Sequence, residues 1–144
     1  NTADGRFWVV SASGGAPLML CTIPETRQLM GAVWRPDGSI VLAVWRGNLY
    51  QVPATGGEPR ALVTIVRGKE VDFHTPVALP DGRVLVVTHL EPPADGGSGS
   101  GSNTLEVIDG LVPEDEPVGA QDVGRRTELL HRIEVLKGEA PLLY

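Results

Sequence analysis

The sequence is poor in the residues that form covalent cross-links or stacking contacts. It has one cysteine, Cys21, among 144 residues, so no disulfide can form within the chain. Aromatic residues make up only 5%, and no cluster of Lys or Arg stands out among 12 basic and 18 acidic side chains, which give a net charge of −6. These shortages argue against a phosphate-binding track or a base-stacking surface, so we expect no nucleic-acid partner.

Long hydrophobic runs are also lacking. Pro, Gly or a charged residue interrupts each apolar stretch within a few positions, so the sequence predicts no membrane-spanning helix. No signal peptide is recognisable, and the chain begins with Asn1 rather than methionine, which leads us to expect a piece of a longer protein. The cellular compartment stays open at this level.

Glycine (18) and proline (12), by contrast, are frequent, which favours many short elements separated by turns. The clearest pattern covers residues 33–62, where four apolar runs alternate with the turn motifs Pro36-Asp37-Gly38, Arg46-Gly47-Asn48 and Gly56-Gly57-Glu58-Pro59. This pattern predicts four strands of one antiparallel meander. Residues 40–45 are nearly all apolar, so we expect this strand to be buried on both faces, as in stacked sheets.

Parts of this unit recur along the chain. Gly14-Gly15 precedes Gly56-Gly57 by 56 − 14 = 42 residues, and Pro80-Asp81-Gly82 follows Pro36-Asp37-Gly38 by 80 − 36 = 44 residues. Leu105 follows Leu49 by 56 residues, which indicates an insertion of roughly 56 − 42 = 14 residues in the later copy. A period of about 42 residues with four strands per copy is typical of β-propeller blades.

The repeat predicts an all-β fold, a partial β-propeller of about three four-stranded antiparallel blades that does not close. The expected parts are the second half of a blade (1–28), a complete blade (29–70), a blade with two insertions at 90–103 and 110–124 (71–136), and the first strand of a further blade (137–144). Residues 126–133 also fit a short helix, although their position in the copy favours a strand. Because a blade buries its faces only against neighbours, we expect the end blades to expose apolar surface.

The strand order places the loops on two rims. Connections between second and third strands share one rim with the connections between blades, whereas the Pro-Asp-Gly and Gly-Gly turns lie on the opposite rim. Function on a rigid scaffold concentrates in loops. The candidate binding residues on the first rim are Arg27, Arg46, Asn48, Lys69, Asp72 and His74.

The side chains with chemical potential have simple structural interpretations. Asp72 and His74 could form an acid/base or metal pair, but we favour a turn aspartate and a strand-end histidine, because no third ligand has diagnostic spacing. His89 and His131 are isolated in the sequence. With no G-x-S-x-G or H-E-x-x-H motif, we predict no catalytic residue, no metal site and no cofactor.

Residues of three further types are expected to serve the fold. Asp37 and Asp81 fill the aspartate position of tight turns. Cys21 has no nearby group to activate it. The three tryptophans fit packing between blades better than an aromatic ligand cage; they are Trp8, Trp34 and Trp45.

The string WRPDGSIVLAVWRGNLYQVPATGGEPRAL, residues 34–62, resembles the WD-repeat-like β-propeller repeats of the TolB type. That pattern is a strand, S/W-x-P-D-G, a strand, and L-Y-x-V-P-x-x-G-G-E-P-x-x-L. The resemblance covers residues 6–20, 29–66 and 74–109. The variant Val-Pro-Ala-Thr-Gly-Gly-Glu-Pro is similar to propellers C-terminal to bacterial Ser/Thr protein kinases and to those of other bacterial surface and periplasmic proteins.

The resemblance implies a non-catalytic sensor or protein-interaction module within a larger bacterial protein such as a Ser/Thr protein kinase. Its partners would be a protein, a peptide or the remaining blades of the parent propeller, and its location would be extracytoplasmic or periplasmic. Two alternatives stay open. One is the gating propeller of a prolyl-oligopeptidase-type serine peptidase, and the other is a stand-alone TolB-like periplasmic scaffold.

Overall fold

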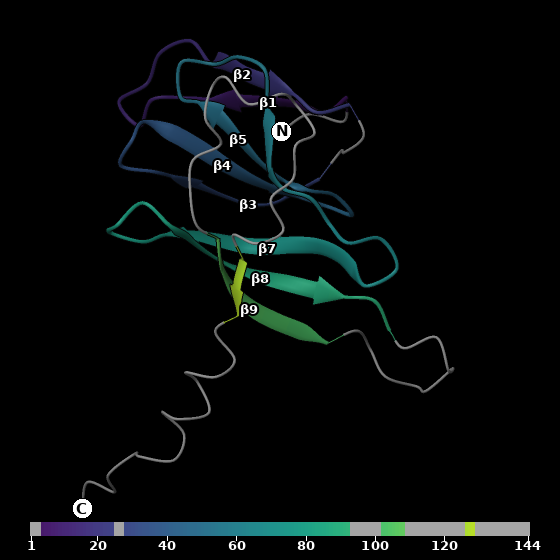
Figure 1. Ribbon diagram of the computed structural model, residues 1–144. Helices are drawn as coiled ribbons and strands as arrows, with labels where there is room; N and C mark the ends of the chain where they lie inside the picture. The colour runs from purple at the N-terminus through teal and green to yellow at the C-terminus, as the bar shows by residue number, and fades with distance from the viewer. Residues whose placement is uncertain (1–3, 25–27, 93–101, 109–125, 129–144) are drawn as a thin grey trace, which may run out of the picture.

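The computed structural model describes residues 4–24, 28–92 and 102–108, together with the backbone strand at 126–128. Within these ranges every regular element is a β-strand, which confirms the all-β prediction, and no helix that could cross a membrane is present. The strands form three antiparallel sheets, none of them closed, which lie one above another in Figure 1. We call them the first, middle and third sheets.

The first sheet contains β1 (Arg6–Val9) and β2 (Leu18–Thr22). The middle sheet has the order β3-β4-β5-β6, a meander of the strands β3 (Leu29–Trp34), β4 (Ser39–Val44), β5 (Leu49–Pro53) and β6 (Arg60–Val63). The third sheet has the order β10-β9-β8-β7, with the strands β7 (Glu70–Ala78), β8 (Val84–Leu90), β9 (Asn103–Ile108) and β10 (Arg126–Glu128). The strand alternative is therefore confirmed for residues 126–128. The insertion at 110–124 and residues 137–144 lie outside the described residues.

The two Pro-Asp-Gly turns have the same internal hydrogen bonds. Asp37 Oδ1 accepts a bond from the backbone N–H two residues on, at 2.8 Å, and Asp81 Oδ1 accepts the equivalent bond at 3.1 Å. The turn glycines Gly38 and Gly82 have φ values of 82° and 87°, a backbone conformation that favours glycine. Both aspartates thus serve their turns as the sequence predicts.

The strand registers repeat as well. Val33 lies opposite Val41 in the middle sheet, and Val77 lies opposite Leu85 in the third sheet, so both strands are offset by 44 residues (77 − 33 and 85 − 41). The next strand is offset by 56, because Leu49 lies opposite Ala43 and Leu105 lies opposite Val87. The insertion in the third sheet is therefore 56 − 44 = 12 residues rather than roughly 14, since the period of this copy is 44 and not 42.

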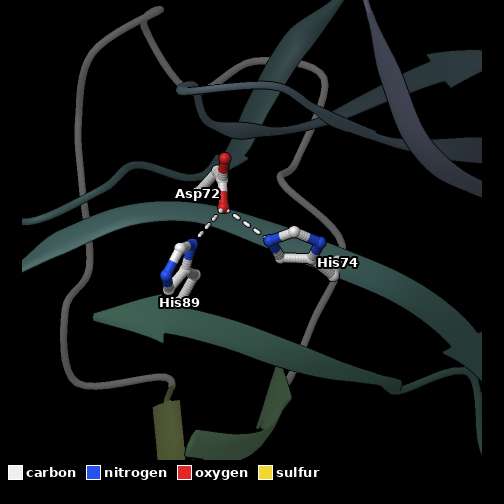
Figure 2. Close-up of side chains that lie close together, drawn as sticks. All are labelled: Asp72, His74 and His89. Atoms are coloured by element: carbon white, nitrogen blue, oxygen red, sulfur yellow. Dashed lines mark ion pairs between the residues drawn. The ribbon is translucent and has the colours of Figure 1, made fainter. Parts of the chain in front are cut away.

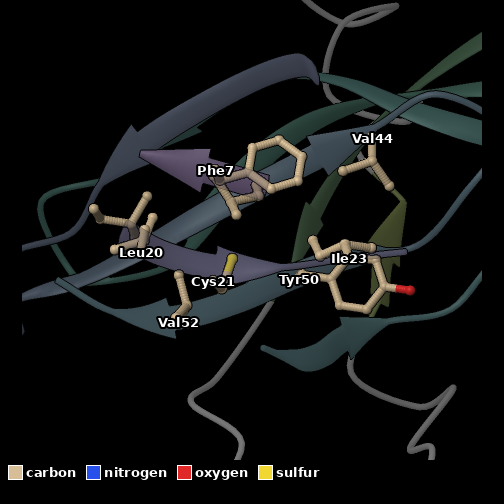
Figure 3. Close-up of a cluster of buried hydrophobic side chains, with 9 residues drawn as sticks. Phe7, Leu20, Cys21, Ile23, Val44, Tyr50 and Val52 are labelled. Carbon is tan, nitrogen blue, oxygen red and sulfur yellow. The ribbon is translucent and has the colours of Figure 1, made fainter. Parts of the chain in front are cut away.

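Strand β4 is the centre of the stack, because all six of its residues are buried. Ile40, Leu42 and Val44 pack toward the first sheet in the cluster drawn in Figure 3, which includes Phe7, Leu20, Cys21 and Ile23. Val41 and Ala43 belong to a second cluster with the third-sheet residues Phe73, Val84, Val86 and Ile108. The prediction of a strand buried on both faces is confirmed for residues 40–44, whereas Trp45 lies beyond the strand and is exposed.

The middle and third sheets also meet at a buried arginine. Arg35 is 4% exposed, and its guanidinium donates hydrogen bonds to the carbonyl oxygen of Gly82 and, at 3.2 Å, to Gln51 Oε1. A carboxylate oxygen of Asp37 lies 3.8 Å away. One side chain of the middle sheet thus holds the β7–β8 turn of the third sheet in place.

The tryptophan prediction is wrong. Trp8, Trp34 and Trp45 are 44%, 56% and 44% exposed instead of packed between sheets. Trp34 is exposed because the first sheet has only two strands, which are the equivalents of β5 and β6 at an offset of 42. No strand among the described residues therefore covers β3 on that side. An apolar groove of about 230 Å³ is left there, lined among others by Phe7, Trp8, Leu20 and Trp34.

Candidate functional site

Three of the predicted rim residues lie around the turn between β4 and β5 and the start of β7. The backbone N–H of Arg46 donates to Asp72 Oδ2 at 3.0 Å, which joins the middle sheet to the third. Asn48 Oδ1 accepts from the N–H of Ile65 at 3.1 Å, so the asparagine side chain supports the loop that follows β6. The structure therefore brings Arg46 and Asp72 into contact and gives Asn48 a supporting role.

Lys69, another predicted rim residue, is not part of the contact between Arg46 and Asp72. The backbone N–H of Lys69 donates to the carbonyl of Val66 at 3.0 Å, and its carbonyl accepts from the N–H of Glu91 at 2.8 Å, so Lys69 lies where the chain enters β7. Arg27 lies outside the described residues.

Asp72 is not a turn residue, contrary to the sequence interpretation. Strand β7 begins two residues earlier, at Glu70, whose carboxylate accepts a 2.7 Å hydrogen bond from the N–H of Val66 and so closes the preceding loop. Asp72 and His74 both lie inside the strand, two positions apart. Side chains at this spacing project from the same side of a regular strand, so the pair is held by sheet geometry and not by a loop.

His89 is isolated in the sequence but not in the fold. His89 lies directly opposite Asp72 in the β7–β8 register, and Figure 2 shows both histidine rings approaching the same carboxylate. His74 Nε2 is 2.7 Å and His89 Nδ1 is 3.5 Å from Asp72 Oδ1. The imidazole rings themselves are 5.7 Å apart, at an interplanar angle of 62°. In the described part of the chain these three residues form the one group of His, Cys, Asp and Glu with metal-binding proximity.

Burial sets the electrostatics of this cluster. Asp72 is fully buried, whereas the His74 and His89 side chains are 26% and 32% exposed. Although two nitrogens lie close, no hydrogen bond of proper geometry reaches Asp72 Oδ1 from any described residue. A buried carboxylate oxygen in this state is costly unless a cation or a donor compensates it. The cluster is therefore a place where the charge of a bound cation would be stabilised.

The repeat shows that the fold does not require these side chains. At the offset of 44 the equivalents of Asp72, His74 and His89 are Gln28, Met30 and Trp45 (72 − 28, 74 − 30 and 89 − 45). The backbone N–H of Trp45 bonds to the carbonyl of Gln28 at 3.0 Å, so the same strand pairing forms there without any ionisable group. Aligning the two units at this offset would have placed His89 opposite Asp72 from the sequence, because Trp45 pairs with Gln28.

Cys21 offers little reactivity. It is buried in the cluster of Figure 3, and burial raises the pKa of its thiol to about 11. The thiolate is the reactive form, so a thiol with this pKa is a poor nucleophile at neutral pH. The prediction that nothing activates Cys21 agrees with this environment.

Comparison with protein-family models, with curated proteins and with solved structures found no match for this chain.

Proposed function

We propose that this chain is part of a β-propeller in a larger bacterial protein and acts there as a non-catalytic sensor or protein-interaction module. The observation that carries the proposal is the repeated register. The β3–β4 and β7–β8 pairs match at an offset of 44 residues, and each belongs to a sheet that packs face to face with its neighbour. Consecutive four-stranded units stacked in this way are the building principle of propellers.

The apolar groove supports the same proposal. It lies between the first sheet and the strands β3 and β4, and Trp8 and Trp34 are among its lining residues. In a propeller the two inner strands of the preceding unit occupy this position. In the third sheet, the face that corresponds to the groove side of the middle sheet is covered by β3 and β4. We therefore assign the groove to the equivalent pair of strands from the preceding unit.

The parent gene tests this function. A protein-kinase domain, recognised by its glycine-rich loop and H-R-D motif and followed by repeats of this type, would support a sensor module. A gene that encodes a single closed propeller would remove the kinase link and favour the stand-alone scaffold. Neither architecture would give the chain a catalytic role of its own.

The peptidase alternative has a separate criterion. A gating propeller requires a following α/β-hydrolase domain with a G-x-S-x-G nucleophile turn in the same gene. Peptidase activity of the full gene product, abolished by replacing the serine of that motif, would establish this alternative and overturn the sensor proposal.

A further inference from the structure

We propose that Asp72, His74 and His89 form a binding site for a divalent transition-metal ion of the zinc type. The site goes beyond the interaction role proposed above and does not depend on it. It rests on three observations: the convergence of the three ligand atoms, the burial of an oxygen that lacks a hydrogen bond, and the absence of these side chains from the equivalent positions of the other unit.

The distances fit a metal ion with little rearrangement. Zinc binds imidazole nitrogen and carboxylate oxygen at roughly 2.0–2.2 Å, so two ligand atoms of a tetrahedral site lie about 3.4 Å apart. Asp72 Oδ1 is 2.7 Å from His74 Nε2 and 3.5 Å from His89 Nδ1, and all three ligand atoms lie within 4.8 Å of one another. Small rotations of the two partly exposed imidazoles bring the three atoms to the tetrahedral spacing.

The carboxylate is oriented in advance. Asp72 Oδ2 accepts the backbone N–H of Arg46 at 3.0 Å, which leaves Oδ1 to face the two histidines. Hydrogen bonds of this kind to a ligating carboxylate fix its orientation and raise metal affinity. Arg46 has a positive φ of 50°, a conformation that is uncommon for a residue other than glycine, so the turn directs its N–H at the carboxylate despite a conformational cost.

The ligand types select the metal. Two imidazoles and one carboxylate suit Zn²⁺, Co²⁺ or Ni²⁺, whereas Mg²⁺ and Ca²⁺ prefer oxygen ligands alone. Three protein ligands leave at least one coordination position of the metal open. Because His74 and His89 are partly exposed, this position faces the surface, where a water molecule or a donor group of a partner can occupy it.

The test is metal titration of the 144-residue chain, freed of metal by a chelator. Co²⁺ should produce the visible absorption of a nitrogen-ligated, low-coordinate ion, and Zn²⁺ should displace it and raise the melting midpoint, while Mg²⁺ and Ca²⁺ should do neither. His74→Ala and His89→Ala should each weaken Zn²⁺ binding by about a hundredfold or more, since loss of a hydrogen-bond partner to a ligand alone costs about 10- to 100-fold. Asp72→Asn should also weaken binding, but this substitution is at a fully buried residue and can prevent folding. The two histidine variants keep the test valid in that case.

His131→Ala is the matched control, because it removes the one remaining histidine of the chain. This variant should bind Zn²⁺ as the unmodified chain does. The proposal is overturned if the unmodified chain shows neither cobalt absorption nor a zinc-dependent rise in the melting midpoint. It is overturned equally if binding survives both His74→Ala and His89→Ala, because the metal would then be held elsewhere.

Discussion

Replacing Arg35 by alanine should loosen the third sheet from the middle sheet. Arg35 is 4% exposed, and its guanidinium donates to the Gly82 carbonyl and to Gln51 Oε1, so its removal leaves two acceptors without their charged donor. A hydrogen bond to a charged group contributes about 1.5–3 kcal/mol. The Asp37 carboxylate at 3.8 Å adds little. We therefore expect the free energy of unfolding to fall by about 3 kcal/mol.

Thermal unfolding followed by circular dichroism measures this loss. For a chain of this size each kcal/mol shifts the melting midpoint by roughly 2–4 °C, so Arg35→Ala should lower it by roughly 6–12 °C. Arg83→Ala is the matched control, since the Arg83 side chain is 44% exposed and pairs with Asp81 within the same turn. An exposed pair contributes at most about 1 kcal/mol. Equal midpoints for the two variants would refute the role of Arg35 as an inter-sheet contact.

Three other outcomes follow from the same structure. Trp34→Ala should lower the unfolding free energy by less than about 1 kcal/mol, because the indole is 56% exposed, and a loss of 3 kcal/mol or more in a urea titration would show a buried tryptophan instead. Cys21 should react with iodoacetamide at pH 8 far more slowly in the folded chain than in urea, since its thiol pKa is about 11; equal rates would contradict its burial. Although burial opposes it, hydrogen bonds from Ser39 lower the pKa of Asp37, and hydrogen bonds from Arg83 lower the pKa of Asp81. The unfolded chain then binds more protons in acid, so stability should fall as the pH drops below about 4, and a urea midpoint that stays constant down to pH 2 would contradict this assignment.

The turns and the central strand could be predicted from the sequence because local chemistry dictates them. Asp37 and Gly38 specify a tight turn whatever surrounds them, and the same motif recurs at Asp81 and Gly82 with the same hydrogen bonds. The uninterrupted apolar run in β4 requires cover on both faces, and both core clusters supply it. These features depend on few residues that are close in the sequence.

The exposure of Trp34 and the Asp72 cluster could not be predicted in the same way. Whether an apolar side chain is covered depends on which strands lie opposite it, and the first sheet has none over β3. His89 is 89 − 72 = 17 residues from Asp72, and only the register of β7 with β8 brings them together. A pattern search that looks for ligands at short spacing misses a site formed across two strands.

If each unit covers the face of the next, the groove should accept two more strands of the same type. A second copy of residues 29–45, joined directly before Asp4, would supply these two strands. The junction keeps the repeat in register, because Asp4 is the equivalent of Arg46 at the 42-residue offset (46 − 4). The control is the same addition carrying Leu42→Asp in the copy, which removes its apolar core side chain.

The measurement is hydrogen exchange of the Trp34 indole N–H by NMR, read together with the melting midpoint. We expect slower exchange and a higher midpoint for the extended chain, but not for the control, because the added strands cover Trp34 and the groove beside it. An extended chain in which exchange at Trp34 and the melting midpoint both stay unchanged would contradict the stacking of repeat units.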